Sequence, residues 1–235
     1  MQLTQPQIDQ LYTFTQQHYV EYYDLQTELV DHLANAIETQ WRENPKLTFD
    51  ESLNVEFKKF GIFGFMEVVE NRKAALYKKY NGLVWQHFKD FFGFPKLLLT
   101  ILLSVLVFTI FKITDYKEII VLGFFGVVFS FTIYRLIQSR RQQQKNSKQS
   151  EKKWLFEEVI NRYGNFSVIM FVPFNLVAQL YSSIPQLFKN DFYSWCLSII
   201  LVLSSFFLFI VFKIIPSKTE EYLMDTYPEY KLLSV

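Results

Sequence analysis

Long stretches without charged side chains dominate the second half of the chain. Four such runs occupy 97–111, 119–134, 163–188 and 192–212, and they contain 15, 16, 26 and 21 residues. At about 1.5 Å of rise per residue, the first two reach only about 22–24 Å, whereas a hydrocarbon core is about 30 Å thick. Lysine and arginine side chains at their ends can snorkel, which extends their effective length. The pattern therefore predicts four transmembrane helices, at about 96–113, 118–136, 165–187 and 192–214.

A buried helical hairpin in a soluble core is the alternative interpretation of the first two runs. Two longer apolar runs follow them, however, and a soluble domain of 235 residues has too little interior to bury four such helices. We therefore predict that all four runs are inserted in a membrane.

Positive charge near the spans predicts their orientation. The loop 135–162 holds eight lysine and arginine residues, whereas the connection 112–118 holds two and the turn near Lys189 holds one. Because basic loops stay on the cytoplasmic side, the loop 135–162 is predicted to be cytoplasmic. Four spans then place both termini on that same side.

The first 82 residues have a different pattern, in which apolar residues recur at helical intervals among 12 acidic and 8 basic side chains. Thr4 and Gln7 form a capping box that predicts a first helix. Apolar residues at every fourth position predict a second helix that begins near Asp24 and ends before Pro45. Its apolar stripe is Leu25, Leu29, Leu33, Ile37 and Trp41.

A third helix is predicted to begin at Thr48, which forms another capping box with Glu51, and to stop at Gly61. Helical periodicity then resumes and changes near the Asn81-Gly82 pair. Residues 83–95 mix aromatic and polar side chains, as segments in the headgroup layer do, so we predict an amphipathic interfacial helix or linker. A further packing helix of the N-terminal domain is the alternative.

Together these patterns predict an all-α protein with a small cytoplasmic helical domain followed by a four-helix transmembrane bundle. The domain covers 1–82, the interfacial segment 83–95, the bundle 96–215 and a cytoplasmic tail 216–235. Small residues on the second and fourth spans indicate close packing within the bundle or contact with another copy of the chain. They are Gly123, Gly126 and Ser130, and Ser194, Ser198 and Ser205.

Three short motifs follow one another in the N-terminal region: ELVDHLANAIE at 28–38, TFDES at 48–52 and FGIFG at 60–64. In this order they make the segment 19–71 resemble the HAAS-type helical domain, a small bacterial cytoplasmic module found beside membrane spans. The segment departs from the family at Ser52, where alanine is common, and after Gly61, which no proline follows. The resemblance implies a role in signalling or regulation, often alongside PadR-type transcriptional regulators or ABC-type permeases, and no catalytic residues.

Few side chains in this region are candidates for metal binding. Glu28 and His32 lie four residues apart, with Asp31 beside them, and such carboxylates and imidazoles bind metals in helical bundles. His18 and Glu21 would have to add ligands from the preceding helix, and no spacing brings them there. Because His32 lies beside the apolar stripe, we interpret it as a half-buried packing histidine. The sequence thus indicates no catalytic, cofactor-binding or metal-binding residues.

The predicted spans also lack reactive side chains. None of the four runs contains His, Asp, Glu, Lys or Arg, which disfavours haem ligation and a charged proton or ion relay. Asn175 and Gln179 lie four apart near Pro173, and we interpret them as interhelical hydrogen-bonding groups, with a polar permeation path as the alternative. We interpret Cys196 as a packing residue.

The basic loop and the tail have competing interpretations. The loop lacks interleaved aromatic residues, so we favour contact with anionic lipid over direct nucleic-acid binding. Its centre is predicted to be a flexible linker, and 154–162 an interfacial helix. The tail is predicted to form two short turns around Pro228 at most, and it either docks on the N-terminal domain or is disordered. The docking residues would be Tyr222, Leu223, Tyr227 and Tyr230.

The leading hypothesis is a multi-pass adaptor or sensor of the bacterial cytoplasmic membrane, without enzymatic activity or cofactor. Its expected partners are the lipid bilayer and a cytoplasmic regulatory protein that binds the helical domain. The alternative is an accessory subunit of a membrane transporter. A membrane enzyme or a small-solute channel that uses Asn175 and Gln179 is the third class.

Overall fold

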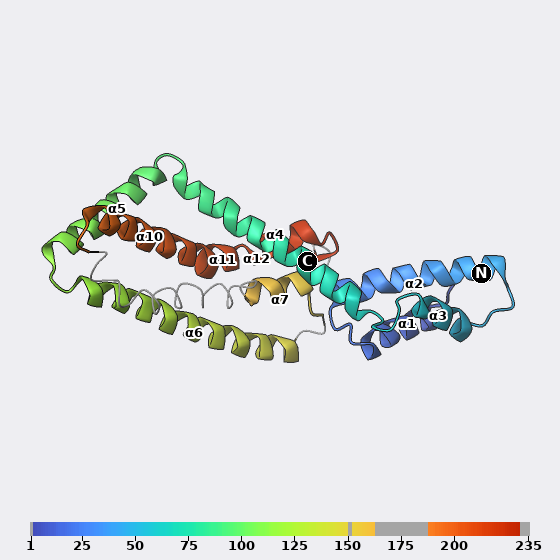
Figure 1. Ribbon diagram of the computed structural model, residues 1–235. Coiled ribbons are helices and arrows are strands. Elements are labelled where there is room, and N and C mark those ends of the chain that lie inside the picture. The colour runs from blue at the N-terminus through green and yellow to red at the C-terminus, as the bar shows by residue number, and fades with distance from the viewer. Residues whose placement is uncertain (1, 150–151, 163–187, 231–235) are drawn as a thin grey trace. The chain divides into compact units, whose positions relative to one another are not determined.

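The computed structural model describes residues 2–149, 152–162 and 188–230 of the chain. All regular secondary structure in these ranges is helical (Figure 1), which confirms the all-α prediction for them. The helices are α1 (Gln5–Gln17), α2 (Tyr23–Glu43), α3 (Phe49–Lys58), α4 (Met66–Lys89), η1 (Asp90–Phe92), α5 (Lys96–Ile113), α6 (Lys117–Gln149), α7 (Leu155–Asn161), α10 (Asp191–Phe209), η3 (Ile210–Ile214), α11 (Ile215–Ser217) and α12 (Thr219–Thr226).

The helices belong to two compact units, and the first contains the N-terminal helices. It comprises Met1–Leu76, Ser147–Glu158 and Tyr227–Val235. The predicted apolar stripe of α2 is confirmed, because Leu25, Leu29, Leu33, Ile37 and Trp41 are all buried. Both predicted capping boxes are also present, at Thr4 before α1 and at Thr48 before α3. The N-terminal helices therefore form where local sequence and burial favour the same structure.

Two glycines shape the turn between α3 and α4. Gly61 and Gly64 have φ angles of +74° and +52°, in the left-handed region that residues with a Cβ rarely adopt. The helix α3 ends at Lys58, three residues before the predicted stop at Gly61. A Cβ on Gly64 would lie 3.0 Å from the ring of Phe57. A side chain at this position would therefore be disfavoured both by the backbone conformation and by this close contact.

Alanine substitutions at two glycines should have opposite effects on stability. Gly64→Ala should destabilise the protein by about 1–2 kcal/mol, since it forces a positive φ and a close contact with Phe57. Gly82→Ala should stabilise it by about 0.4–1 kcal/mol, because Gly82 lies inside α4 with open space around its Cβ position. Thermal unfolding of the full chain in lipid nanodiscs measures both changes. A lower midpoint for Gly82→Ala would contradict the helical assignment there.

The helix α4 is continuous from Met66 to Lys89, across the Asn81-Gly82 pair where the periodicity changes. Buried side chains on both sides of the glycine explain this: Leu76, Tyr80 and Val84 are 4%, 2% and 6% exposed. Their burial outweighs the cost of about 1 kcal/mol that glycine has in a helix. The residues 83–89 thus continue α4, and only 90–95 form the connection to α5.

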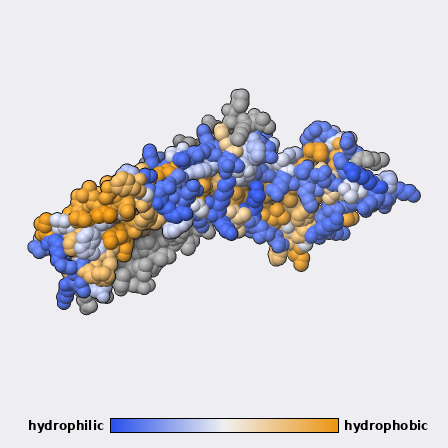
Figure 2. Space-filling model, turned by 90° about the horizontal axis from the view of Figure 1, so that it is seen from above, coloured by the Kyte–Doolittle hydropathy of each residue, from blue (hydrophilic) through white to orange (hydrophobic). Residues whose placement is uncertain are grey.

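The second unit comprises Tyr77–Asn146 and Val159–Thr226 and contains the apolar helices. Three described stretches are long and apolar enough to cross a membrane: Lys96–Ile113, Lys117–Arg135 and Asp191–Ser217. Figure 2 shows hydrophobic residues gathered over the part of the surface formed by α5, where Leu98, Ile101 and Leu102 are exposed. An exposed apolar face of this kind is typical of a helix in contact with lipid.

The helices α5 and α10 pack against one another and run antiparallel. Phe91, just before α5, stacks on Phe206 with ring centroids 4.6 Å apart, and Phe108 stacks on Trp195 at the same distance. An ion pair between Lys112 and Asp191 joins the end of α5 to the start of α10.

Small residues allow close packing in this helix pair. Thr100 and Ser104 of α5 and Ser194 and Ser198 of α10 are buried. Their hydroxyl groups donate to backbone carbonyls within their own helices, which satisfies them without water. Close packing is therefore confirmed at Ser194 and Ser198. Ser205, Gly123, Gly126 and Ser130 are exposed among the described residues, and their packing in the bundle or against another copy of the chain stays a prediction.

The helix α6 runs parallel to α10. Near its start, the Lys117 ammonium lies 5.8 Å from the ring centroid of Phe188, and further along Arg135 donates to the carbonyl of Phe212 at 3.0 Å. It continues into the basic loop as far as Gln149, so the flexible linker predicted at the centre of that loop was wrong for its described part up to Gln149. Arginine, lysine and glutamine have good helix propensities, which explains the extension. The predicted span 165–187 lies outside the described residues.

Candidate functional site

Asp24, near the start of α2, joins three segments of the first unit that are far apart in the sequence. The hydroxyl of Tyr227 donates to Asp24 Oδ2 at 2.8 Å, and the backbone N–H of Leu155 donates to Oδ1 at 3.1 Å. Leu155 is the first residue of α7, where an N–H has no acceptor within its own helix, so Asp24 supplies one. We call Asp24, Trp154, Leu155 and Tyr227 the Asp24 junction.

Trp154 gives the junction its apolar part. Its side chain is only 5% exposed, and its ring centroid lies 5.4 Å from that of Tyr23 and 4.8 Å from that of Tyr227. The backbone N–H of Tyr23 donates to the carbonyl of Lys153 at 2.8 Å. Lys153 also forms an ion pair of 3.3 Å with Glu21. The segment before α7 is thus fixed to α2 by ring packing, a backbone hydrogen bond and a charge pair.

The junction confirms that the C-terminal segment docks on the N-terminal helices, which was one of two alternatives for the tail. Tyr227 is 3% exposed, and the ring of Tyr230 packs on Trp154 with centroids 5.4 Å apart. The regular structure of the tail is the helix α12, which ends at Thr226 before Pro228 and in which Tyr222 and Leu223 are buried. Residues 231–235 lie outside the described residues.

Burial controls the ionisation of the junction. It raises the pKa of Asp24 above its ordinary value of 3.8, and the hydrogen bonds from Tyr227 and Leu155 oppose this rise only in part. Burial and the neighbouring Asp24 carboxylate raise the pKa of Tyr227 above its ordinary value of 10.0. The tyrosine therefore remains a protonated donor at neutral pH, and the junction acts as a hydrogen-bonded support for three segments.

The raised pKa of Asp24 predicts a pH dependence of stability. The unfolded chain loses this proton at lower pH than the folded protein, so the contribution is greatest below pH 3.8 and is lost as pH rises through the folded pKa. The Asp24→Asn variant lacks this contribution. The melting temperature of the wild type minus that of the variant should therefore fall as the pH rises above 3.8. A constant or rising difference would contradict the assigned direction.

Glu56 is another buried carboxylate of the first unit. It is 4% exposed, Lys59 Nζ lies 2.6 Å from its Oε1, and Gln40 donates to the same oxygen. Burial alone would raise the pKa of Glu56, but the hydrogen bonds from Lys59 and Gln40 outweigh it, and the pKa is lowered. This carboxylate is therefore an ionised structural link between α2 and α3.

A second polar cluster lies in the second unit, where α4 meets α12. His87 Nε2 and the Tyr222 hydroxyl share a hydrogen bond of 2.7 Å, and His87 Nδ1 lies 3.6 Å from Asp90 Oδ2. The carboxylate favours a proton on Nδ1, which assigns Nε2 as the acceptor. Burial raises the pKa of Tyr222 to about 12, so its hydroxyl remains a donor.

Lys79 attaches the other end of α12 to α4. Its ammonium lies 3.1 Å from Asp225 Oδ2 and donates to Thr226 Oγ1 at 2.9 Å. Together with the His87–Tyr222 bond, this contact fixes α12 along α4. The residue that follows α12 is Tyr227 of the Asp24 junction.

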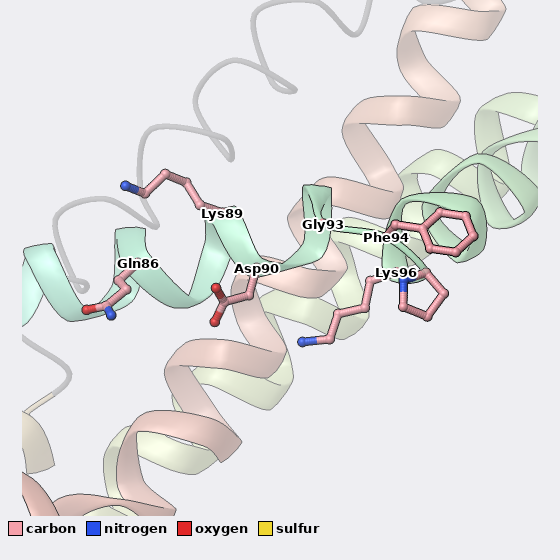
Figure 3. Close-up of a pocket in the computed structure, with 7 residues that line it drawn as sticks. Gln86, Lys89, Asp90, Gly93, Phe94 and Lys96 are labelled. Carbon is pink, nitrogen blue, oxygen red and sulfur yellow. The ribbon is translucent and has the colours of Figure 1, made fainter.

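An open cavity of about 550 Å³ lies at the elbow where α4 passes through η1 into α5. Figure 3 shows Gln86, Asp90 and Lys96 projecting to one side of the ribbon, with the Lys96 ammonium directed toward Asp90, whereas Lys89 projects to the other side. The exposed ring of Phe94 forms part of the rim. Lys89 belongs to the lining as well, so the cavity is lined by two lysines, one carboxylate and one amide group at the start of an apolar helix.

The structure does not bring the metal-ligand candidates together. Glu28, Asp31 and His32 are exposed, so the interpretation of His32 as a half-buried packing residue was wrong. His18 has that role instead: its ring lies 4.1 Å from Phe14 and 4.3 Å from Phe57, measured between centroids. Among the described residues, no group of three His, Cys, Asp or Glu side chains could hold a metal ion.

The other candidates of the sequence add little to a site. Cys196 is a half-buried free cysteine of α10, as expected for a packing residue. Asn175 and Gln179 lie outside the described residues. No sequence pattern indicated the partners of Asp24, His87 and Tyr227, which are 131 or more positions away.

Comparison with protein-family models, curated proteins and solved structures returned no match to this chain.

Proposed function

We propose that this protein is a multi-pass membrane adaptor or sensor without enzymatic activity, whose cytoplasmic helical domain binds a regulatory protein. The Asp24 junction is its main support. Residues 152–155 precede the apolar run 163–188, and Tyr227 follows α10 and α12. Leu155, before the apolar run 163–188, and Tyr227, after α10 and α12, therefore both donate to one buried carboxylate of α2. Movement of the apolar helices would act on α2 through these contacts.

Helix directions support the proposed bundle of four spans. Lys117 and Asp191 lie at one end of the described helices, and Arg135 lies beside Phe212 at the other. Because α6 and α10 run parallel, the chain that leaves one end after Arg135 must return to the opposite end before Asp191. One further crossing by the apolar run 163–188 would accomplish this.

The proposed orientation follows from charge. The segment 135–162 contains eight basic residues, so the positive-inside rule favours a cytoplasmic location for it, and four spans would place both termini there. The described helices within the segment, the end of α6 and α7, are compatible with this assignment because neither contains a long apolar run.

The proposed relation to HAAS-type domains is supported by where the three motifs lie. ELVDHLANAIE lies within α2, TFDES includes the capping box that begins α3, and FGIFG forms the turn with two left-handed glycines. Each motif thus corresponds to a distinct helical element. A regulatory role without catalysis is also supported by Asp24, Glu56 and His87, which all join helices or segments to one another.

Affinity purification from the native membrane in mild detergent tests the proposed function. The wild type and Asp24→Asn should recover the same cytoplasmic protein in similar amounts, because asparagine keeps an acceptor for Leu155. Asp24→Leu, which disrupts the junction, should change the recovered amount severalfold. The comparison links partner binding to the junction and not merely to the presence of the helical domain.

Recovery of this chain alone under all growth conditions would contradict the adaptor role. Co-purification with a permease, together with loss of export after deletion of the chain, would favour the transporter subunit instead. Equal recovery of a partner with all three forms would contradict the part played by the junction.

A further inference from the structure

We propose that the elbow cavity between α4 and α5 binds the headgroup of a zwitterionic phospholipid with a phosphate and a primary ammonium, such as phosphatidylethanolamine. This inference goes beyond the proposed function, because it requires insertion of α5 in a bilayer but no protein partner for the N-terminal helices. It rests on the charged side chains that line the cavity and on the position of the cavity at the start of α5.

The charges of the elbow match a zwitterion. Lys96 and Asp90 face the same cavity, yet they form no ion pair, and Lys96 instead lies 5.2 Å from the ring centroid of Phe91. A phosphate can accept from the Lys96 ammonium, while the adjacent ammonium donates to the Asp90 carboxylate and to the amide oxygen of Gln86. Figure 3 shows these three side chains on the same side of the ribbon, with the Asp90 carboxylate between the other two.

The position of the elbow points to a lipid. Lys96 is the first residue of α5, so the cavity lies where a polar helix gives way to a candidate membrane span. Beside it, Phe94 is 82% exposed and Leu98 is 55% exposed, and the apolar surface continues along α5 to Ile101. Acyl chains could follow this surface while the headgroup stays at the level of Lys96.

The carboxylate distinguishes between headgroups. Asp90 would repel a purely anionic headgroup such as phosphatidylglycerol, because a like charge would lie within the same cavity. A trimethylammonium group cannot donate a hydrogen bond, so phosphatidylcholine would satisfy Asp90 less well than a primary ammonium. The set of Gln86, Asp90 and Lys96 therefore favours the ethanolamine headgroup.

The site also has a connection to α12. Asp90 lies 3.6 Å from His87 Nδ1, and His87 is bonded through Nε2 to Tyr222 of α12. An ammonium held by Asp90 would compete with His87 for the same carboxylate. Lipid occupancy would thus alter the contact that fixes α12 along α4.

Native mass spectrometry of the full chain in detergent tests the assignment. Dioleoyl phosphatidylethanolamine, phosphatidylcholine and phosphatidylglycerol are added at equal concentration, and bound lipid is counted for the wild type, Lys96→Gln, Asp90→Asn and Lys78→Gln. Lys78→Gln is the matched control, since this lysine is exposed on the same helix α4 and does not line the cavity. O-phosphoethanolamine and inorganic phosphate are added separately to distinguish a soluble ligand from a lipid.

The wild type and Lys78→Gln should retain phosphatidylethanolamine in preference to the other two lipids. Lys96→Gln and Asp90→Asn should each weaken its retention about tenfold, as expected for loss of one charge-assisted hydrogen bond. Asp90→Asn should also remove the discrimination against phosphatidylglycerol. O-phosphoethanolamine should bind far more weakly than the lipid.

Equal retention of the three lipids by the wild type would overturn the proposal, as would unchanged retention in both Lys96→Gln and Asp90→Asn. Binding of O-phosphoethanolamine as tight as that of the lipid would assign the site to a soluble ligand. Circular dichroism of each variant checks that helix content is unchanged, so that lost retention reports the site itself.

Discussion

Replacement of Trp154 by alanine is expected to release residues 152–155 from α2. The indole is 5% exposed and packs on Tyr23, Tyr227 and Tyr230, and truncation of such a side chain costs about 3–5 kcal/mol. Since each 1.4 kcal/mol is about tenfold in an equilibrium, the open population of this segment should rise more than about a hundredfold. Tryptic cleavage after Lys153 in nanodiscs measures that population.

Trp85→Ala is the control for this prediction. Trp85 is 59% exposed and stacks only on Phe88 among the ring contacts of the described residues, so its truncation should change stability by less than about 1 kcal/mol. Equal cleavage rates after Lys153 in the wild type and Trp154→Ala would show that the indole does not fix the segment.

Asp24→Leu is expected to have the second large effect. Leucine removes the acceptor for both the Tyr227 hydroxyl and the Leu155 N–H, and each buried donor without a partner costs about 1–3 kcal/mol. Asp24→Asn should lie within about 1 kcal/mol of the wild type, because its carbonyl accepts from Leu155 and its amide can donate to Tyr227. Urea unfolding of the full chain in nanodiscs, followed by tryptophan fluorescence, measures the difference in stability.

The difference in stability between Asp24→Leu and Asp24→Asn shows whether the hydrogen bonds or the charge of Asp24 stabilise the protein. If leucine and asparagine destabilise the protein equally, the contribution of Asp24 comes from its charge and not from the hydrogen bonds to Leu155 and Tyr227. If neither has an effect, the junction does not stabilise the first unit.

Much of the helical architecture was predictable because local patterns determine it. The span predicted at 96–113 coincides with α5, since Lys96 and Lys112 bound a run of apolar residues. The second helix was expected near Asp24 and begins at Tyr23, because its apolar residues recur every four positions and are all buried. In both cases periodicity and burial favour the same structure.

The errors arose where packing or helix propensity outweighed a local signal. The interfacial segment was predicted to begin after Asn81-Gly82, yet flanking buried residues keep α4 continuous through this pair. The polar composition after Arg135 resembles a linker, although arginine and glutamine extend α6 readily. The position of His32 beside the stripe suggested burial, but only the fold places aromatic rings around His18.

The functional contacts could not be read from the sequence because they join distant positions. Asp24 and Tyr227 are 203 positions apart, and His87 and Tyr222 are 135 apart. No spacing or motif relates such residues, and only the tertiary arrangement shows that the tail contacts both α2 and α4. The Tyr222 and Tyr227 side chains were named as docking residues, but their partners were not.

Hydrogen exchange at Leu155 in nanodiscs tests the central claim most directly. This amide lies at the start of α7 and donates only to Asp24 among the described hydrogen bonds, so its protection reports the junction. Exchange should be slow in the wild type and Asp24→Asn and at least tenfold faster in Asp24→Leu, with the core of α10 unchanged. Equally fast exchange in all three proteins would show that the segment before α7 is not held on α2.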